Sequence, residues 1–442
     1  MLRRIIPRGI FTVNLMENEY SGLKIRGGNP LEGSLRISGA KNAALPVLCA
    51  TILSSGKFEV SNCPRLTDVF TLLELLKSLG ARWEWDTDGS VLEPPPPLNI
   101  DTSHINSFEA PFELVQKMRA SFLVLGPLLA RFGRAKVPLP GGCEIGARPV
   151  NFHLAGLEAL GAQWKIESGF VDVSVHKLKG ARILLDFPSV TGTENILMAA
   201  TLAHGKTIIE NAAMEPEVVD LGSMLKNMGA KIEGLGTSTI VVEGVKSLRP
   251  VPWTIIPDRI EAGTFMMAVG IAGGRLELKN ANPAHLDAVI SKLAASGLEI
   301  HQKKDAIEVR RRTRIKSVDV TTMPYPGFPT DLQAQMTAMM AFSSGLSVIT
   351  EQIFENRFRH VDELRRLGAD IRVEQRSAII RGKDELTGAP LTATDLRASA
   401  SLVIAGLGAK GTTTVFDIHH LDRGYEGLDE KLRSVGAEIK RI

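Results

Sequence analysis

The chain has 442 residues, of which 44% are hydrophobic and 23% are charged, and its formal net charge is +3. This length exceeds one ordinary hydrophobic core and the composition is that of a globular protein, so we expect two or more domains and exclude a disordered chain. The small positive charge does not indicate a nucleic-acid partner, and no apolar run is long enough to predict membrane insertion.

The first twenty residues are basic and partly apolar, but Pro7 and Arg8 interrupt the apolar run. No small-residue cleavage site follows, so we interpret residues 1–20 as an N-terminal extension, with a true start at Met16 as the alternative. The three cysteines, Cys49, Cys63 and Cys143, have no metal-ligand spacing and predict neither a disulfide framework nor a zinc site. A reducing, cytoplasmic location fits this cysteine usage.

One structural unit repeats along the rest of the chain. A glycine turn leads into a short apolar strand at 56–62, 205–211 and 274–280, with looser copies at 345–351 and 411–417. Further on, a second glycine closes a helix at positions 80, 161, 229, 297, 368 and 436. The unit that ends at position 161 matches the pattern least well. Six α/β units predict two domains of three units each.

Two kinds of helix are expected in these units. The segment from Thr67 to Leu79 keeps its leucines on one face, and Thr67 or Asp68 is expected to cap it. Segments such as 42–53, 194–203 and 395–407 are small and apolar on all sides, which predicts buried helices with the strands outside them.

The domain boundary is expected in the proline-rich segment 250–257, between the third and fourth units. We assign the opening strand at 23–26 to the second domain, so two chain segments would connect the domains. The predicted first domain is 41–256, and the second is 21–40 plus 257–442.

Several segments carry residues suited to chemistry. Lys41 opens a helix, where a cation and free backbone amides favour an anion site, although a solvated surface lysine is the plainer interpretation. Cys143 lies in the glycine-rich loop 140–149, where the nearby Arg148 would lower the pKa of its thiol. A lone loop cysteine is more often not catalytic.

Two aspartates, Asp331 and Asp395, each follow a threonine at an expected helix start. Capping by the threonine and a favourable helix dipole would explain both pairs. Arginines in apolar or glycine-rich contexts suit a doubly anionic ligand, and unrelated surface ion pairs are the alternative. They are Arg119, Arg148, Arg357, Arg397 and Arg423.

From about Leu23 to the C-terminus, the chain resembles the enolpyruvyl transferase family. The resemblance rests on SGAKNAALP (38–46), LPGGCEIGARPV (139–150), FPTDLQAQ (328–335), TDLRASASLV (394–403) and HLDRGYE (420–426). The chain resembles the branch of the family that uses a UDP-sugar, because it contains the cysteine loop and the shikimate branch lacks that loop. The resemblance implies two inside-out α/β barrel domains, each of three repeated units, with the active site in the cleft between them.

The resemblance also implies an activity: transfer of the enolpyruvyl group of phosphoenolpyruvate to the 3′-hydroxyl of UDP-N-acetylglucosamine, with release of phosphate. In the family this addition–elimination opens peptidoglycan precursor synthesis, in the cytoplasm, with no cofactor and no metal. A transferase like the shikimate enzyme, a phosphoryl transferase and a non-catalytic UDP-sugar-binding relative remain open, as does the oligomeric state.

Roles for individual residues follow from the same resemblance. Cys143 is the expected acid and Asp331 the expected base, with Lys41, Asp395 and Arg397 supporting them. Phosphoenolpyruvate would be bound by Lys41, Asn42, Arg148 and Arg423. UDP-N-acetylglucosamine would contact Asn42, Arg119, Arg148, Pro149, Val150, Asn151, Phe152, Ser189, Val190, Thr191, Asp331, Ile353 and Arg357. Thr191 and Asn151 depart from the family, in which glycine and aspartate are common there.

Overall fold

The computed structural model describes residues 22–139 and 150–442, so the N-terminal extension and the loop 140–149 lie outside the described residues. Within those ranges the strands form six small sheets, one for each predicted unit. The unit with the weakest sequence pattern is the one whose sheet has three strands, while each of the other sheets has four. The repeat therefore predicts the number of sheets correctly.

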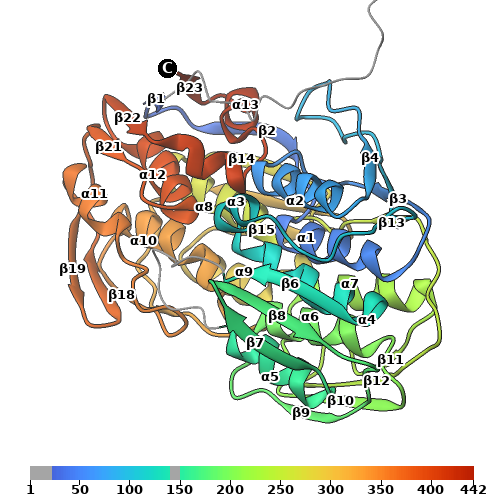
Figure 1. Cartoon of the computed structure of the whole chain (residues 1–442). Helices are drawn as coiled ribbons and strands as arrows, with labels where there is room; N and C mark the ends of the chain where they lie inside the picture. The colour runs from blue at the N-terminus through green and yellow to red at the C-terminus, as the bar shows by residue number, and fades with distance from the viewer. Residues whose placement is uncertain (1–21, 140–149) are drawn as a thin grey trace, which may run out of the picture.

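Three sheets belong to the first half of the chain (Figure 1). The first contains β3 (Lys57–Ser61), β4 (Arg82–Glu84), β5 (Leu98–Asp101) and β13 (Trp253–Thr254), the second β6 (Arg134–Pro138), β7 (Gln163–Glu167) and β8 (Phe170–Ser174), and the third β9 (Arg182–Leu184), β10 (Lys206–Glu210), β11 (Lys231–Glu233) and β12 (Thr239–Glu243).

The helices of this half are α1 (Lys41–Ala50), α2 (Thr67–Ser78), α3 (Phe112–Lys117), α4 (Leu125–Phe132), α5 (Asn151–Ala159), α6 (Val190–Ala200) and α7 (Pro216–Met228), with 3₁₀ turns η1 (Thr51–Leu53) and η2 (Arg119–Val124). In β10 buried and more exposed residues alternate, because successive side chains of a strand point to opposite faces. From Gly192 onward, by contrast, every residue of α6 is buried. Strands buried on one face and a helix buried on all sides from Gly192 onward place the helix inside and the sheet outside.

The second half repeats this arrangement. One sheet contains β1 (Gly22–Arg26), β21 (Pro390–Thr392), β22 (Thr412–Phe416) and β23 (Glu438–Arg441). A second contains β2 (Leu31–Arg36), β14 (Gly274–Lys279), β15 (Glu299–Gln302) and β16 (Ala306–Arg311). The third contains β17 (Val320–Thr321), β18 (Leu346–Thr350), β19 (Asp370–Glu374) and β20 (Ser377–Arg381).

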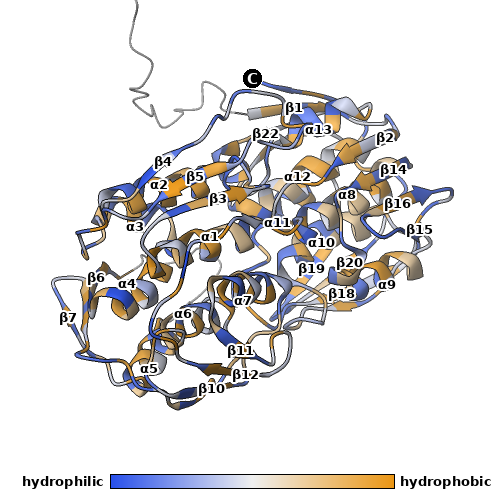
Figure 2. Cartoon of the chain, turned by 90° about the vertical axis from the view of Figure 1, so that its right-hand side faces the viewer, coloured by the Kyte–Doolittle hydropathy of each residue, from blue (hydrophilic) through white to orange (hydrophobic). Residues whose placement is uncertain are grey.

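The helices of the second half are α8 (Arg259–Ala272), α9 (Asp287–Ala295), α10 (Gln333–Ala341), α11 (His360–Arg366), α12 (Leu396–Gly408) and α13 (Leu428–Ser434), with turns η3 (Pro283–His285), η4 (Thr330–Leu332) and η5 (Ile418–Arg423). Helices α8, α10 and α12 pack against one another at the centre. Hydrophobic residues predominate along α12 (Figure 2), because it is surrounded by protein on all sides.

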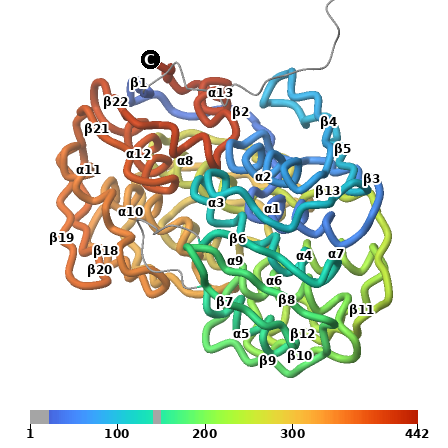
Figure 3. Tube along the Cα trace, viewed as in Figure 1, coloured from blue at the N-terminus to red at the C-terminus, as the bar shows by residue number. Residues whose placement is uncertain are grey.

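The buried apolar side chains form two clusters. One runs from Ala40 to Ile255, and the other combines Leu23–Ile37 with Ile260–Ile439. β1 pairs with both β22 and β23, and β2 pairs with β14, so the first strands of the chain lie beside its last elements (Figure 3). The clusters support the domain limits 41–256 and 21–40 plus 257–442, which we retain as a proposal.

A buried polar network occupies the place where the chain crosses between the two halves. The Lys431 ammonium, which is fully buried, donates to Glu261 Oε1 at 2.6 Å and to Ser38 Oγ at 2.7 Å. Ser38 donates in turn to Glu426, whose other carboxylate oxygen accepts from Arg65 Nε at 2.6 Å. Because Arg65 belongs to the first half and Glu426 to the second, the network joins the halves.

The capping predictions for α2 and α12 are wrong. The N-cap residue of α2 is Leu66, with no side-chain hydrogen bond, so neither Thr67 nor Asp68 caps that helix. The N-cap of α12 is Asp395 and not the preceding threonine: its carboxylate accepts from the backbone N–H groups of Arg397 and Ala398. Among the described residues, no helix is both long enough and apolar enough to cross a bilayer.

Candidate active site

The start of α1 brings a cation to the junction of the two halves. Lys41 is the first residue of α1, and its Nζ lies 3.0 Å from Asp68 Oδ2. The other Asp68 oxygen accepts from Arg423 Nε, on η5 of the second half, at 2.9 Å. One carboxylate therefore orients two cations that the family resemblance predicts to bind phosphoenolpyruvate.

Asp68 is ionised because of these two neighbours. Burial alone would raise the pKa of its carboxyl, but the charges and hydrogen bonds of Lys41 and Arg423 outweigh burial and hold that pKa below its usual range. Lysine has three N–H donors and arginine five, so a single shared carboxylate leaves both cations able to bind a further anion. Sequence reasoning missed Asp68, because its position at a helix start suggested a cap.

Asp331 is held by two buried arginines. Arg357 Nη2 lies 2.7 Å from Oδ1, and Arg397 Nη2 lies 2.8 Å from Oδ2. Burial opposes ionisation of this carboxyl, but the two guanidinium groups hold its pKa well below the usual range. Asn42 Nδ2, from α1 of the first half, lies 3.4 Å from the same Oδ2. The structure thus brings Asn42, Asp331, Arg357 and Arg397 together.

Neighbouring side chains fix the positions of Arg357 and Ile353. Thr330 Oγ1 donates to Glu351 Oε2 at 2.8 Å and accepts from Arg357 Nη1 at 2.9 Å. The other Glu351 oxygen accepts from the backbone N–H of Ile353 at 2.7 Å. The threonine before Asp331 is therefore not a helix cap, since the N-cap residue of η4 is Pro329. It belongs to the scaffold that holds the predicted sugar-binding residues.

The predicted nucleotide residues gather at the starts of two adjacent helices, α5 and α6. Val150, Asn151 and Phe152 stand at the beginning of α5. Ser189, Val190 and Thr191 begin α6, where Ser189 is the N-cap residue and its Oγ accepts from the N–H of Gly192 at 3.2 Å. The N–H groups of a first helical turn have no acceptor within the helix, so this end of α6 is suited to an anion.

Arg119 opens η2 near these helices, and its charge acts on a histidine that the sequence did not single out. Burial and, to a smaller extent, the charge of Arg119 lower the pKa of His153 to about 4. His153 lies on α5 and its ring faces Thr191 Oγ1 across 3.3 Å. A histidine in an apolar helix pattern gives no sequence signal of this kind.

Three predicted residues, Cys143, Arg148 and Pro149, lie outside the described residues. The other two cysteines, Cys49 and Cys63, are buried in the first half, and burial raises the pKa of both thiols. Neither is therefore suited to be a nucleophile or an acid. In the part of the chain that the structure describes, no cluster of His, Cys, Asp and Glu side chains could hold a metal ion.

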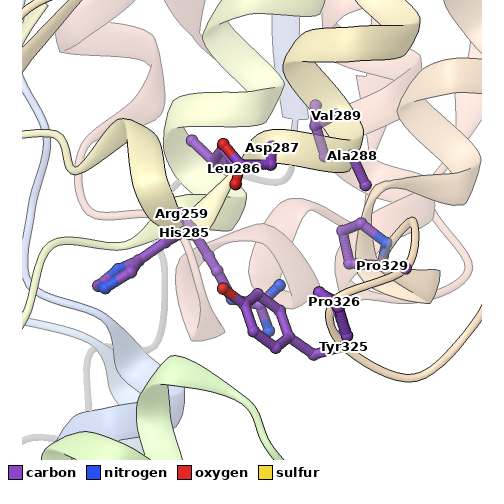
Figure 4. Close-up of a pocket in the computed structure, with 10 residues that line it drawn as sticks. Arg259, His285, Leu286, Asp287, Ala288, Val289, Tyr325, Pro326 and Pro329 are labelled. Atoms are coloured by element: carbon purple, nitrogen blue, oxygen red, sulfur yellow. The ribbon is translucent and has the colours of Figure 1, made fainter. Parts of the chain in front are cut away.

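A separate small hollow lies where Arg259 and the start of α9 face the loop before η4. Figure 4 shows the Tyr325 ring beside Arg259, whose guanidinium carbon is 5.5 Å from the ring centre. Arg259 also pairs with Glu217 at 2.9 Å. No residue predicted for catalysis or substrate binding lines this hollow, so it is distinct from the site described above.

A family model described as EPSP synthase (3-phosphoshikimate 1-carboxyvinyltransferase) matches residues 25–432 of this chain. UDP-N-acetylglucosamine 1-carboxyvinyltransferases from Geobacter metallireducens and Thermodesulfovibrio yellowstonii are 53% and 55% identical to it, each over 95% of this chain and 99% of the relative. The chain belongs to the UDP-N-acetylglucosamine 1-carboxyvinyltransferase family. The predicted resemblance is thereby confirmed.

Solved structures of related enzymes confirm the predicted fold class of this carboxyvinyltransferase family member. The enolpyruvyl transferase NikO from Streptomyces tendae has a TM-score of 0.85 and 28% identity, covering 95% of this chain and 98% of that one. An EPSP synthase from Acinetobacter baumannii has a TM-score of 0.72 at 19% identity, covering 95% of this chain and all of that one, and supports the fold alone.

Proposed function

We propose that this chain transfers the enolpyruvyl group of phosphoenolpyruvate to the 3′-hydroxyl of UDP-N-acetylglucosamine and releases phosphate. The observation that carries the proposal is the identity of more than half of the aligned residues with relatives of that name, over 95% of the chain. The reaction would open peptidoglycan precursor synthesis, in the cytoplasm, with two small-molecule substrates.

The reaction proceeds by addition and then elimination. The sugar 3′-hydroxyl loses its proton and its oxygen bonds to C2 of phosphoenolpyruvate, while C3 gains a proton. Phosphate then leaves from C2 and a proton leaves from C3, which restores the double bond. Asp331 is the proposed base and Cys143 the proposed acid at C3, each of a type that contributes about 10²–10⁴-fold to a rate.

The ion pairs of Asp331 constrain its role. A carboxylate whose two oxygens each accept from an arginine is a permanent anion and a weak proton acceptor. It is well suited to accept a hydrogen bond from the sugar hydroxyl. The Asp331 carboxylate becomes a stronger base when it loses one of its two guanidinium partners. We therefore propose that Arg357 or Arg397 exchanges its contact with Asp331 for a contact with the ligand during the reaction.

The cations around Asp68 supply the proposed phosphate site. Lys41 and Arg423 are oriented from opposite sides by one carboxylate, and Arg148 would join them from the loop. Cations already in place for the departing phosphate stabilise the charge that develops on it. Asn42 would contact both the substrate and Asp331, as its 3.4 Å approach to that carboxylate suggests.

A phosphate-release assay tests the proposal. Phosphate should appear only when phosphoenolpyruvate and UDP-N-acetylglucosamine are both present, and a chelator should not stop its release. Shikimate 3-phosphate in place of the nucleotide sugar is the control and should give none. Release of pyruvate would instead indicate a phosphoryl transferase, and a strict magnesium requirement would also overturn the proposal.

A further inference from the structure

A line of hydrogen bonds with a fixed direction runs from the backbone of α4 to the first turn of α6. The Gly126 N–H donates to Asn195 Oδ1 at 2.6 Å, and Asn195 Nδ2 donates to the Phe122 carbonyl at 3.3 Å. A backbone N–H can only donate and a carbonyl can only accept, so these two contacts fix which end of the fully buried Asn195 amide is which.

The orientation of Asn195 determines the tautomer of His153. Asn195 Nδ2 lies 2.8 Å from His153 Nδ1 and must donate to it, so Nδ1 carries no proton. The proton of the neutral ring is then on Nε2. Burial and the charge of Arg119 lower the pKa of this histidine to about 4, which agrees with a neutral ring near neutral pH. The Phe122 ring, edge-on at 5.2 Å between centroids, packs against the imidazole.

The donor-to-acceptor order of these hydrogen bonds continues from His153 to Thr191. His153 Nε2–H faces Thr191 Oγ1 at 3.3 Å and donates to it. A hydroxyl that accepts here still has one proton of its own to donate. Thr191 is solvent-exposed at the start of α6, beside the Val190 and Ser189 backbone, and its hydroxyl has no second partner among the described residues. The proton is therefore available to a ligand at this helix end.

We propose that His153 is a positioning residue that turns the Thr191 hydroxyl proton toward the diphosphate of the nucleotide sugar. This inference rests on the proposed function, in which the substrate carries a diphosphate, and on the start of α6, where free N–H groups suit an anion. With the opposite tautomer, His153 Nε2 would accept the hydroxyl proton and Thr191 could offer the diphosphate only lone pairs, which would repel its oxygens. The chain Gly126–Asn195–His153 thus determines whether Thr191 attracts or repels the ligand.

The tautomer can be observed directly in the unmodified protein. Nitrogen-15 histidine spectra between pH 6 and pH 8 should contain a neutral ring protonated on Nε2, identified as the histidine that Thr191→Val perturbs. The same signals should remain those of a neutral ring through this pH range. A ring protonated on Nδ1, or a ring that becomes charged in that range, would overturn the proposal.

Binding measurements test the consequence for the ligand. Calorimetry with UDP should show Thr191→Val binding about tenfold more weakly, since a hydroxyl hydrogen bond to a charged oxygen is lost, while Thr191→Ser keeps most of the affinity. His153→Phe should also weaken binding of UDP, but not in the Thr191→Val background. Two results would show that the hydrogen-bond relay from Asn195 through His153 to Thr191 does not act on the ligand. One is wild-type affinity in Thr191→Val, and the other is an equal loss of affinity from His153→Phe in both backgrounds.

The two proposals fail in different ways. If the wild-type protein binds UDP with the expected Thr191 dependence but releases no phosphate from phosphoenolpyruvate and UDP-N-acetylglucosamine, the relay stands and the proposed reaction fails. If it releases phosphate but Thr191→Val binds UDP normally, the reaction stands and the relay fails. The spectra of the wild-type protein decide the tautomer even where His153→Phe does not fold.

Discussion

At the scale of single residues, several side chains for which surface ion pairs were one expectation form buried ion pairs in the structure. Arg357 and Arg397 were expected either to bind anions or to form unrelated surface pairs, and both are buried against Asp331. Residue type and context singled out these arginines, and the structure pairs both with a carboxylate. No sequence pattern could indicate that their common partner is Asp331, because that contact spans 66 residues for Arg397 and depends on how the units pack.

Replacing Asp331 separates its chemical role from its structural one. Asp331→Asn should lower kcat by about two orders of magnitude or more, because an amide cannot take the hydroxyl proton. It should also destabilise the fold, since two buried arginines lose their counter-charge. Steady-state kinetics and urea unfolding measure the two effects, with the surface pair residue Asp362, changed to Asn, as the matched control. Unchanged kcat would rule out the base role.

The lowered pKa of Asp331 also has a consequence for pH dependence. Its carboxylate stays ionised as the pH falls through the ordinary range of an aspartate, and the stability it contributes is lost as the pH falls from that range to the lowered pKa. An acidic limb in the kcat/KM profile near pH 6 must therefore come from another group.

The three cysteines differ in their expected reactivity. Fosfomycin, an epoxide analogue of phosphoenolpyruvate, should alkylate Cys143, since Cys49 and Cys63 are buried and have raised pKa values. Peptide mass spectrometry should find the adduct on Cys143 alone. Cys143→Asp, which keeps an acidic proton, should resist the reagent and is the informative variant. An adduct on either buried cysteine would contradict the assignment.

At the scale of elements, the sequence predicted helix and strand identity well and helix ends less well. Glycine positions and apolar periodicity located all six units, because both are local properties of the chain. Capping depends on the direction of a side chain, which the sequence does not show. The threonine predicted to cap α12 and the Thr67 or Asp68 predicted to cap α2 are therefore not the N-cap residues. Asp68 instead turns to Lys41 and Arg423, and Asp395 rather than its neighbouring threonine caps α12.

The cap of α12 can be tested with a pair of neighbouring substitutions. Asp395→Ala should destabilise the protein by about 1–2 kcal/mol, because two N–H groups at the start of α12 lose their acceptor. Thr394→Ala should cost much less, since Thr394 makes no cap hydrogen bond. Chemical denaturation of both variants gives the comparison. Equal losses would mean that the cap is shared and the assignment to Asp395 is wrong.

At the scale of the whole molecule, the residues of the candidate site come from both halves. Lys41, Asn42 and Asp68 come from the first half, and Asp331 and Arg423 from the second. The sequence indicated this division through the order of its repeats. It did not indicate the contacts that cross the division, such as Arg65 with Glu426, because such pairs have no periodic signature.

A divided site predicts closure on the substrate. A ligand that contacts both halves favours the arrangement in which they meet, to the extent that it binds that arrangement better. Small-angle scattering should show a smaller radius of gyration with saturating UDP-N-acetylglucosamine. Arg65→Met, which removes one cross-half ion pair, should enlarge the ligand-free particle and increase the change on binding. A radius that does not respond to the ligand would mean that the site is preformed.

The pairing of β1 has a consequence for how the protein is made. β1 lies between β22 and β23 in its sheet, so it has no partner strand in that sheet until about residue 412 has been synthesised. The apolar cluster from Ala40 to Ile255, by contrast, is complete in one continuous stretch. Domains generally fold as units during translation. On the ribosome the first half can thus fold while the N-terminal strand waits, unpaired, for the last residues to emerge.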